Sequence, residues 1–190
     1  MNRFWVLVSL VAAIVIAGVA PAHAQAEGAS LRKRLSGEAF VGLDRLAGKS
    51  NLSLGVAGTW FFATEQTDRA VQFGFRPEVG FTRIENFNGS AHEYFFTANL
   101  EMDIVSLHAL GEVSDALVPY LYVGGGFDYL TSDVGNVQSD QSGGLFQVGV
   151  GAKIYPLLNL YIAPQYTYIQ ALGATEASHH RLTAAVGVSF

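Results

Sequence analysis

Charged residues recur at every second position inside otherwise apolar segments of this chain. Arg76 and Glu78 fall on one side of such a segment, and Glu101 with Asp103 fall on one side of another. Alternation with a period of two places these side chains on a single face of a β-strand. The same phase, followed along the chain, collects one set of same-face charges: Glu38, Asp44, Arg76, Glu78, Glu101, Asp103, Asp128, Lys153 and Arg181.

This set can do two kinds of chemistry if its face is an interior one. Buried charges must be paired, so we expect Arg76, Lys153 and Arg181 each to be held by carboxylates. Such a network can simply fill and stiffen an interior. Alternatively, it can gate a narrow pathway that prefers cations, because acids outnumber bases six to three in the set.

A second candidate site lies close to the C-terminus, in "TEASHHRL". Glu176, Ser178, His179 and His180, together with the more distant His92, could supply a nucleophile, a base and an orienting acid. However, adjacent His179 and His180 must point to opposite faces of a strand, and the spacing matches no catalytic or metal motif. We therefore expect no catalysis, no bound metal and no cofactor.

Eight alternating segments have the length to position these residues. In the third, the odd positions up to Phe81 are apolar, whereas the even positions include Arg76 and Glu78. A tilted strand needs about 9 to 11 residues to cross a bilayer, and each segment is about that long or longer. The predicted strands are 38–46, 51–63, 70–84, 93–107, 119–130, 145–155, 160–172 and 179–190.

Segments rich in Gly, Asn, Asp and Ser separate these strands, as turns should. With a periplasmic start, "AGKS", "NFNGS", "TSDVGNVQSDQSG" and "GATEAS" would face the cell exterior. Only the third of these, residues 131–143, offers much material for an external loop. Short loops make a dedicated adhesin less attractive.

Composition excludes several classes of protein. Half of the residues are hydrophobic and only 14% are charged, yet after the N-terminal segment no apolar run is long enough for a membrane helix. The absence of cysteine rules out disulfides and lipid attachment at a cysteine. An excess of 16 acids over 11 Lys and Arg residues argues against a nucleic-acid partner.

The N-terminal segment predicts export. Arg3 precedes an apolar stretch from Phe4 to Ala20, and small residues at positions 22 and 24 follow it. This is the layout of a cleaved secretory signal peptide, with a retained membrane anchor as the alternative. The predicted organisation is a signal peptide at 1–24, a periplasmic lead-in at 25–37 and a single barrel at 38–190.

Alternation alone fits both a membrane barrel, with its apolar face outward, and a soluble lipocalin-like barrel, with that face inward. The polar face carries many glycines, such as Gly74 and Gly80, which would weaken a solvated exterior strand. Inside a narrow barrel, glycine would leave room for the long charged side chains of its neighbours. The opposite face of Leu, Val, Ile, Phe and Tyr suits lipid.

Aromatic residues near the strand ends agree with a membrane barrel, because aromatic belts mark the two membrane interfaces. The predicted belt residues are Trp60, Phe61, Phe62, Tyr94, Phe95, Phe96, Tyr129, Tyr155, Tyr166, Tyr168 and Phe190. The fold class expected from the sequence is therefore all-β: an eight-stranded, antiparallel, up-and-down transmembrane β-barrel with a polar, largely plugged interior.

The Gly-rich stretches "YVGGGFDY" and "VGVGAKIY", the strand "YIAPQYTYI" and the terminal Phe190 resemble the small outer-membrane β-barrel proteins of Gram-negative bacteria, the OmpA/OmpX-type superfamily. The resemblance, which is to the barrel domain of those proteins, covers nearly all of the chain after residue 24. It implies a place in the cell outer membrane, contact with outer-membrane lipid and lipopolysaccharide, and a monomer. It also implies that the barrel-assembly machinery reads Phe190 as an insertion signal.

These motifs specify architecture and not activity. The sequence favours a structural or surface-interaction role without catalysis, because eight strands leave an interior about filled by side chains. A narrow cation-preferring pore is the alternative. A lipid A-modifying enzyme is the second alternative, since small outer-membrane barrels include lipid A deacylases and palmitoyl transferases.

Overall fold

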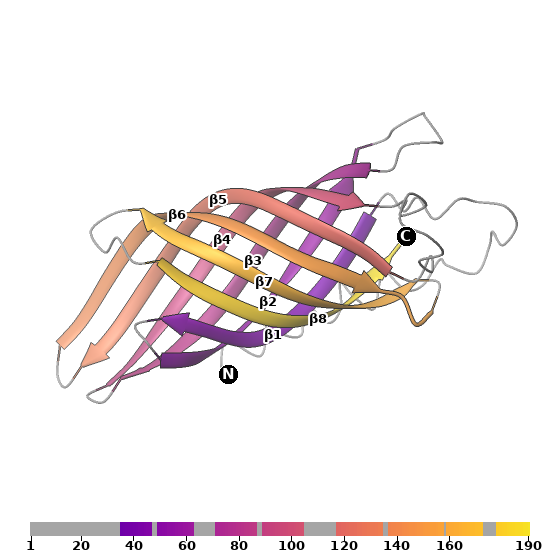
Figure 1. Ribbon diagram of the computed structural model, residues 1–190. Coiled ribbons are helices and arrows are strands. Elements are labelled where there is room, and N and C mark those ends of the chain that lie inside the picture. Colours follow the sequence, from indigo (N-terminus) through magenta and orange to yellow (C-terminus); the bar gives the residue numbers. More distant parts are fainter. Residues whose placement is uncertain are drawn as a thin grey trace, which may run out of the picture.

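The structure, a computed structural model, is a closed barrel of eight antiparallel strands in up-and-down order (Figure 1). It describes residues 35–46, 49–62, 71–86, 89–104, 117–134, 137–157, 159–172 and 178–190. The strands are β1 (Leu35–Leu46), β2 (Lys49–Phe61), β3 (Val71–Asn86), β4 (Gly89–Ile104), β5 (Leu117–Val134), β6 (Val137–Ile154), β7 (Leu160–Leu172) and β8 (Ser178–Ser189).

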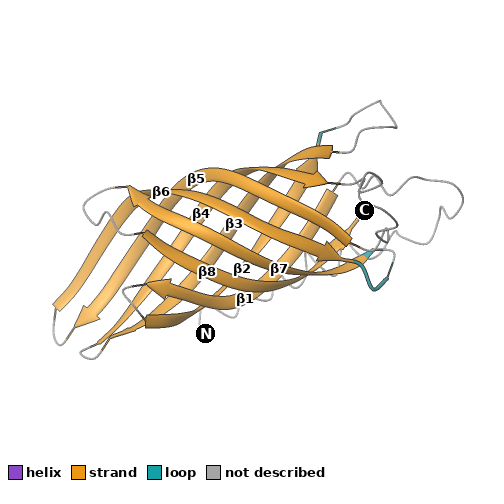
Figure 2. Cartoon of the chain, in the orientation of Figure 1, coloured by secondary structure: helices purple, strands orange, loops and turns teal. Residues whose placement is uncertain are grey.

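All regular structure in the described part of the chain is β-strand (Figure 2). Among the described residues, no helix is long and apolar enough to span a membrane. The predicted fold class and the number of strands are confirmed. We call the end of the barrel where Leu35 and Phe190 lie the terminal end. The opposite end, where β1 meets β2 and β5 meets β6, is called the hairpin end.

The prediction of a long external loop at 131–143 is wrong, because most of this stretch is strand. β5 continues to Val134 and β6 begins at Val137, and the two strands stay paired up to these residues. They extend beyond β1, β2, β7 and β8 at the hairpin end (Figure 1). The Ser, Asp and Gln residues of this stretch resemble a loop in composition. They form a ladder nevertheless, because the pairing is made by backbone groups, which every residue of the two strands carries.

The barrel closes between its first and last strands. β1 pairs with β8 from Ser36 opposite Ser189 to Arg45 opposite His180. The Phe190 N–H donates to the Leu35 carbonyl at 2.8 Å, and the Leu35 N–H donates to the Phe190 carbonyl at 3.3 Å. Closure leaves no unpaired sheet edge that could bind another chain. The final residue therefore takes part in the ladder, while its role as an insertion signal remains a prediction.

The apolar face of every strand points outward. Trp60 is 67% exposed and Leu182 is 61% exposed, whereas Arg76 and Glu78 are buried in the lumen. An exterior covered in this way suits the hydrocarbon of a membrane and not water. The soluble-barrel alternative is therefore wrong. The prediction is wrong for three belt residues as well, because Phe61 and Phe95 lie buried inside the lumen and Tyr155 packs against the lumen residue Tyr161.

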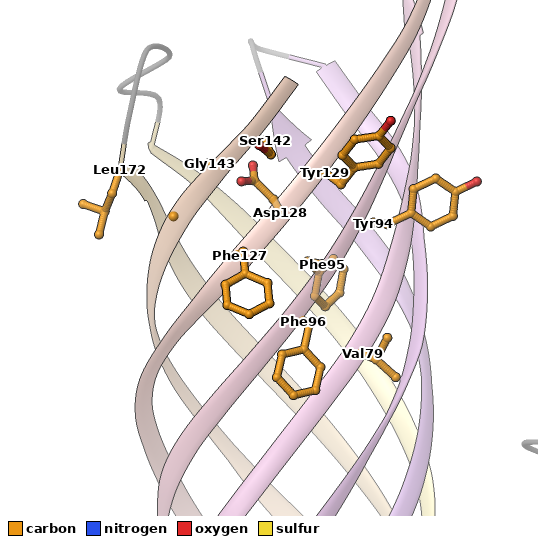
Figure 3. Close-up of a pocket in the computed structure, with 11 residues that line it drawn as sticks. Val79, Tyr94, Phe95, Phe96, Phe127, Asp128, Tyr129, Ser142, Gly143 and Leu172 are labelled. Atoms are coloured by element: carbon orange, nitrogen blue, oxygen red, sulfur yellow. The ribbon is translucent and has the colours of Figure 1, made fainter. Parts of the chain in front are cut away.

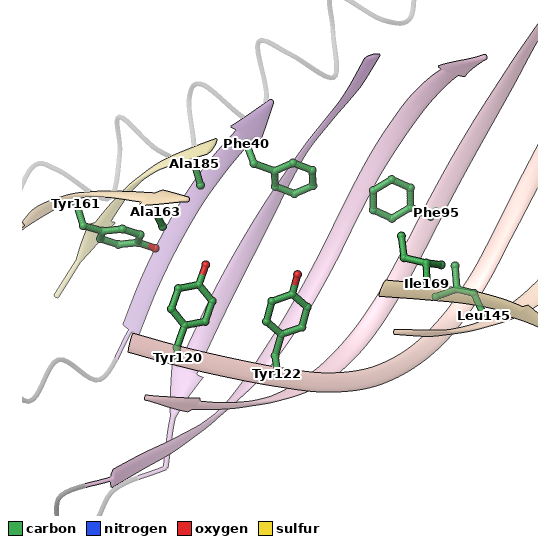
Figure 4. Packing of buried hydrophobic residues seen from close by; sticks show 9 residues of the cluster. All are labelled: Phe40, Phe95, Tyr120, Tyr122, Leu145, Tyr161, Ala163, Ile169 and Ala185. Atoms are coloured by element: carbon green, nitrogen blue, oxygen red, sulfur yellow. The ribbon is translucent and has the colours of Figure 1, made fainter. Parts of the chain in front are cut away.

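Aromatic rings occupy the space that five of the lumen glycines leave, whereas Gly143 faces the Asp128 carboxylate. A Cβ atom added to Gly151 would lie 2.6 Å from the Tyr120 ring, so the ring fits only against a bare backbone. A large ring laid over a glycine on the neighbouring strand covers exposed backbone and fills the interior. Other rings packed in this way are Phe40 over Gly55, Phe95 over Gly80, Tyr122 over Gly149 and Tyr161 over Gly187. These five rings belong to the buried cluster of Figure 4.

Replacing Gly149 by alanine should destabilise the barrel by about 1 to 3 kcal/mol, the usual cost of overpacking. Its Cβ would overlap the ring of Tyr122, whose hydroxyl is hydrogen-bonded to Thr167 at 2.5 Å. The measurement is the unfolding free energy by urea titration in detergent. Gly144→Ala, on the outer face of the same strand, is the control, since its Cβ would make only ordinary contacts at 3.6 Å. Equal stability of the two variants would contradict the close packing.

Candidate functional site

Arg76 is the centre of the lumen network. β3 holds its guanidinium fully buried among three acids from three strands. One terminal nitrogen donates to Glu38 Oε1 at 2.5 Å, and the other donates to Glu101 Oε2 at 2.9 Å. Glu78 Oε2 lies 3.7 Å from the terminal nitrogen that binds Glu38. A guanidinium matches several carboxylates at once because its donors point in fixed, separate directions.

Lys153, from β6, extends the network toward the terminal end. Its Nζ donates to Glu101 Oε1 and to Asp103 Oδ2, each at 2.7 Å. Glu101 therefore bridges Arg76 and Lys153, and it also accepts a hydrogen bond from the Thr59 hydroxyl at 3.2 Å. Two cations shared among several carboxylates make the ion-pair geometry that a buried site requires.

Arg181 closes the network on the side of β8. It donates to Glu78, and more distantly to Gln147 Oε1 at 3.4 Å. Glu78 is thus shared between Arg181 and Arg76, which joins β8 to β3 across the barrel. All three cations of the predicted set carry carboxylate partners in the structure.

Neutral side chains complete the shell of Glu38. The Tyr161 hydroxyl donates to Glu38 Oε2 at 2.9 Å, and the Gln165 amide donates to Oε1 at 2.8 Å. Gln165 also accepts from Arg76 at 3.2 Å, so β7 is tied into the same layer. Hydrogen bonds to the remaining lone pairs are what make a buried carboxylate tolerable.

Each lumen cation also lies over an aromatic ring, which the sequence analysis missed. A cation over a ring face within about 6 Å gains electrostatic attraction. The signal was available, because these rings occupy the polar phase of their strands. The shortest cation-to-centroid distances are 4.8 Å for Arg76 over Tyr122, 4.8 Å for Lys153 over Phe61 and 4.4 Å for Arg181 over Phe95.

Two of the predicted lumen charges lie outside this network. Asp44 and Asp128 lie toward the hairpin end, and neither is within ion-pair distance of the three cations. Asp44 Oδ2 instead lies 3.4 Å from His179 Nε2. Glu93 is a buried acid on the same face of β4 as Glu101, and it lies beside Asp44 and His179. The sequence analysis missed it.

The predicted rim residues do not converge on a catalytic arrangement. Glu176 lies outside the described residues. His179 points into the lumen, whereas His180 points outward and its Nδ1 is hydrogen-bonded to the Tyr166 hydroxyl at 2.7 Å. His92 stacks on the outer Phe81 ring at 5.4 Å. The two adjacent histidines are therefore on opposite faces, as their spacing predicted.

A hollow of about 700 Å³ lies on the wall formed by β3 to β7 (Figure 3). Phe96 and Phe127 stack at its base with ring centroids 5.9 Å apart, while Asp128 and Ser142 line its upper part. No histidine, lysine or arginine is among the described residues that line it. Asp128 is the one carboxylic acid beside Ser142 among the described residues that line the hollow, and no histidine or lysine accompanies it.

A closed barrel with a charged lumen and an apolar exterior defines the outer-membrane class of β-barrel proteins. The chain matches the family described as "Outer membrane protein beta-barrel domain" over residues 9–190, and it belongs to this family. No curated protein matches the chain.

Solved structures share the fold at low sequence identity. Neisserial surface protein A is 18% identical with a TM-score of 0.56, over 86% of this chain and 100% of that one. The attachment invasion locus protein Ail of Yersinia pestis is 13% identical with a TM-score of 0.53, over 82% and 96%. The outer membrane enzyme PagL is 14% identical with a TM-score of 0.53, over 82% and 99%.

Proposed function

We propose that the protein is a structural and surface-contact component of the outer membrane, with a lumen sealed to ions. The observation that carries this proposal is the fully buried network of Arg76, Glu101 and Lys153. It draws side chains from opposite walls into one layer, and aromatic rings pack around it. An eight-stranded barrel is narrow enough for such a layer to fill its section.

The proposed surface role rests on the position of the exposed polar side chains of the β5–β6 hairpin. Beyond the band of outward apolar side chains, the β5–β6 hairpin carries the exposed Ser139, Asp140 and Gln141. With both chain termini on the periplasmic side, this hairpin stands outside the cell and is the surface offered to other molecules. Outer-membrane lipid and lipopolysaccharide contact the apolar band, and the barrel-assembly machinery inserts the monomer through the strand that ends in Phe190.

Planar-bilayer conductance tests the sealed lumen. We expect the refolded protein to show no steady single-channel steps. We expect the same absence of steps from Glu101→Gln/Asp103→Asn. The two amides remove negative charge but keep the size of the carboxyl groups, so the layer stays filled. Steady steps in the wild type, with a cation preference that weakens in this variant, would contradict the proposal. They would instead support the narrow cation pore that the excess of lumen acids favours.

We propose that the barrel has no catalytic activity. The support is the separation of His179 from His180 and the lack of a histidine or lysine beside Ser142 among the described residues. PagL is an enzyme with a similar fold, but the likeness extends to the fold alone. Expression in a bacterial host should leave the mass spectrum of lipid A unchanged, and loss or gain of an acyl chain would overturn this part of the proposal.

A further inference from the structure

We propose that Asp44, Glu93 and His179 form a binding site for one divalent transition-metal ion, such as Zn²⁺, inside the hairpin end of the lumen. The three residues come from β1, β4 and β8. In the closed strand order, β4 lies across the barrel from the adjacent pair β1 and β8. Each residue offers one ligand atom, and these atoms all lie within 4.8 Å of one another.

Each of the three side chains is buried with a polar atom unused. Asp44, Glu93 and His179 are 1%, 6% and 4% exposed. Asp44 Oδ1, Glu93 Oε2 and His179 Nδ1 have no hydrogen-bond partner among the described residues. Buried polar atoms without partners are rare in folded proteins, and a bound ion is one of their recognised explanations. Each of the three side chains thus has unused coordinating capacity, and their gathering in one cluster points to a shared ligand.

The hairpin end of the lumen has more acids than paired cations, which favours the binding of a cation there. Arg76, Lys153 and Arg181 form their ion pairs with Glu38, Glu78, Glu101 and Asp103. Those pairs leave the acids of the hairpin end without an ion pair to any of the three cations. These acids are Glu93, Asp128 and Asp44, of which Asp44 lies 3.4 Å from His179.

The nearest fixed positive charge makes no ion pair with these acids. Arg181 is an electrostatic neighbour of both Asp44 and Glu93, but its guanidinium donates to Glu78. A divalent ion would neutralise Asp44 and Glu93 together, which no side chain of the cluster can do alone. The metal would therefore neutralise acids of the hairpin end and leave the ion pairs of Arg76, Lys153 and Arg181 unchanged.

The donor set selects the class of metal. One imidazole nitrogen with two carboxylate oxygens suits zinc and its first-row neighbours, whereas Ca²⁺ and Mg²⁺ prefer oxygen ligands throughout. Zinc bonds of about 2.0 to 2.2 Å in tetrahedral geometry place ligand atoms about 3.3 to 3.6 Å apart. His179 Nε2 and Asp44 Oδ2 are already 3.4 Å apart, so rotation of the Glu93 side chain is the main adjustment required.

Calorimetric titration with ZnCl₂ tests the site, using the full chain refolded in detergent and freed of metal with a chelator. We expect one saturable site. His179→Gln and Glu93→Gln should each weaken binding by about tenfold or more, since each removes a ligand. His180→Gln and His92→Gln are matched controls, because each replaces the outward neighbour of a proposed ligand, and both should bind as the wild type does.

Folding of each variant is checked by far-ultraviolet circular dichroism, and Asp44→Asn replaces any ligand variant that does not fold. Co²⁺ supplies an independent readout, because a bound cobalt should give visible absorption bands that His179→Gln abolishes. A folded wild type without saturable binding would overturn the proposal. Equal weakening by His180→Gln and His179→Gln would also overturn it, since binding would then be to exterior histidines.

Discussion

Replacing Arg76 by methionine should lower the free energy of unfolding by about 3 to 5 kcal/mol, the usual cost of removing one partner from a buried ion pair. The variant keeps most of the side-chain volume but leaves Glu38 and Glu101 without the guanidinium that binds both. Glu101 retains Lys153, whereas Glu38 keeps only the neutral donors Tyr161 and Gln165. The loss is therefore concentrated on the Glu38 side of the layer.

Urea titration in detergent micelles measures this loss, with Arg45→Met as the matched control. Arg45 is an arginine of β1 whose side chain is exposed on the outer face. Its replacement should change the unfolding free energy by less than about 0.5 kcal/mol. If the two variants are equally stable, the lumen network does not hold the strands together.

Replacing Val150 by arginine should destabilise the barrel in a phospholipid bilayer by about 2 to 4 kcal/mol, the cost of a cation facing lipid near the membrane centre. Val150 is 54% exposed on the outer face of β6, between Leu121 of β5 and Tyr166 of β7. On a barrel surrounded by water, the same change would be nearly neutral. The experiment therefore measures which solvent the outer face meets.

Leu157→Arg is the control for this second experiment. Leu157 is 65% exposed, but it lies in the turn after β6 and not in the transmembrane wall. We expect it to cost no more than about 1 kcal/mol, as arginine does near the membrane interface. A Val150 variant as stable in lipid as the Leu157 variant would show that the exterior band is not in contact with hydrocarbon.

Local pattern was sufficient to predict the number of strands and the face on which the lumen charges lie. A period of two decides which side chains share a face, and this placed Arg76, Glu78 and Glu101 in the lumen before any pairing was known. Which acid meets which cation could not be predicted. Glu101 contacts both Arg76 and Lys153 because of the stagger between β3, β4 and β6, a property of the closed barrel and not of any one segment.

The errors have two physical causes. Aromatic residues were assigned to lipid by type, although Phe61 and Phe95 stand in the polar phase of their strands and fill the lumen. The β5–β6 extension was assigned to a loop by composition, although its polar residues pair as strands. Uncertainty about where the strands end also explains why Glu93 was missed and why His179 was assigned to the rim. The burial of both residues depends on how far the strands continue.

Solvent exchange at the Arg76 guanidinium tests the sealed lumen most directly. Nuclear magnetic resonance of the protein in lipid nanodiscs can follow the side-chain N–H signals of Arg76 beside those of Arg45. The account predicts that the Arg76 protons, which are held by Glu38 and Glu101, exchange far more slowly than those of the exposed Arg45. Arg76 protons that exchange as fast as those of Arg45 would mean that water passes freely through the layer, and the sealed barrel would be contradicted.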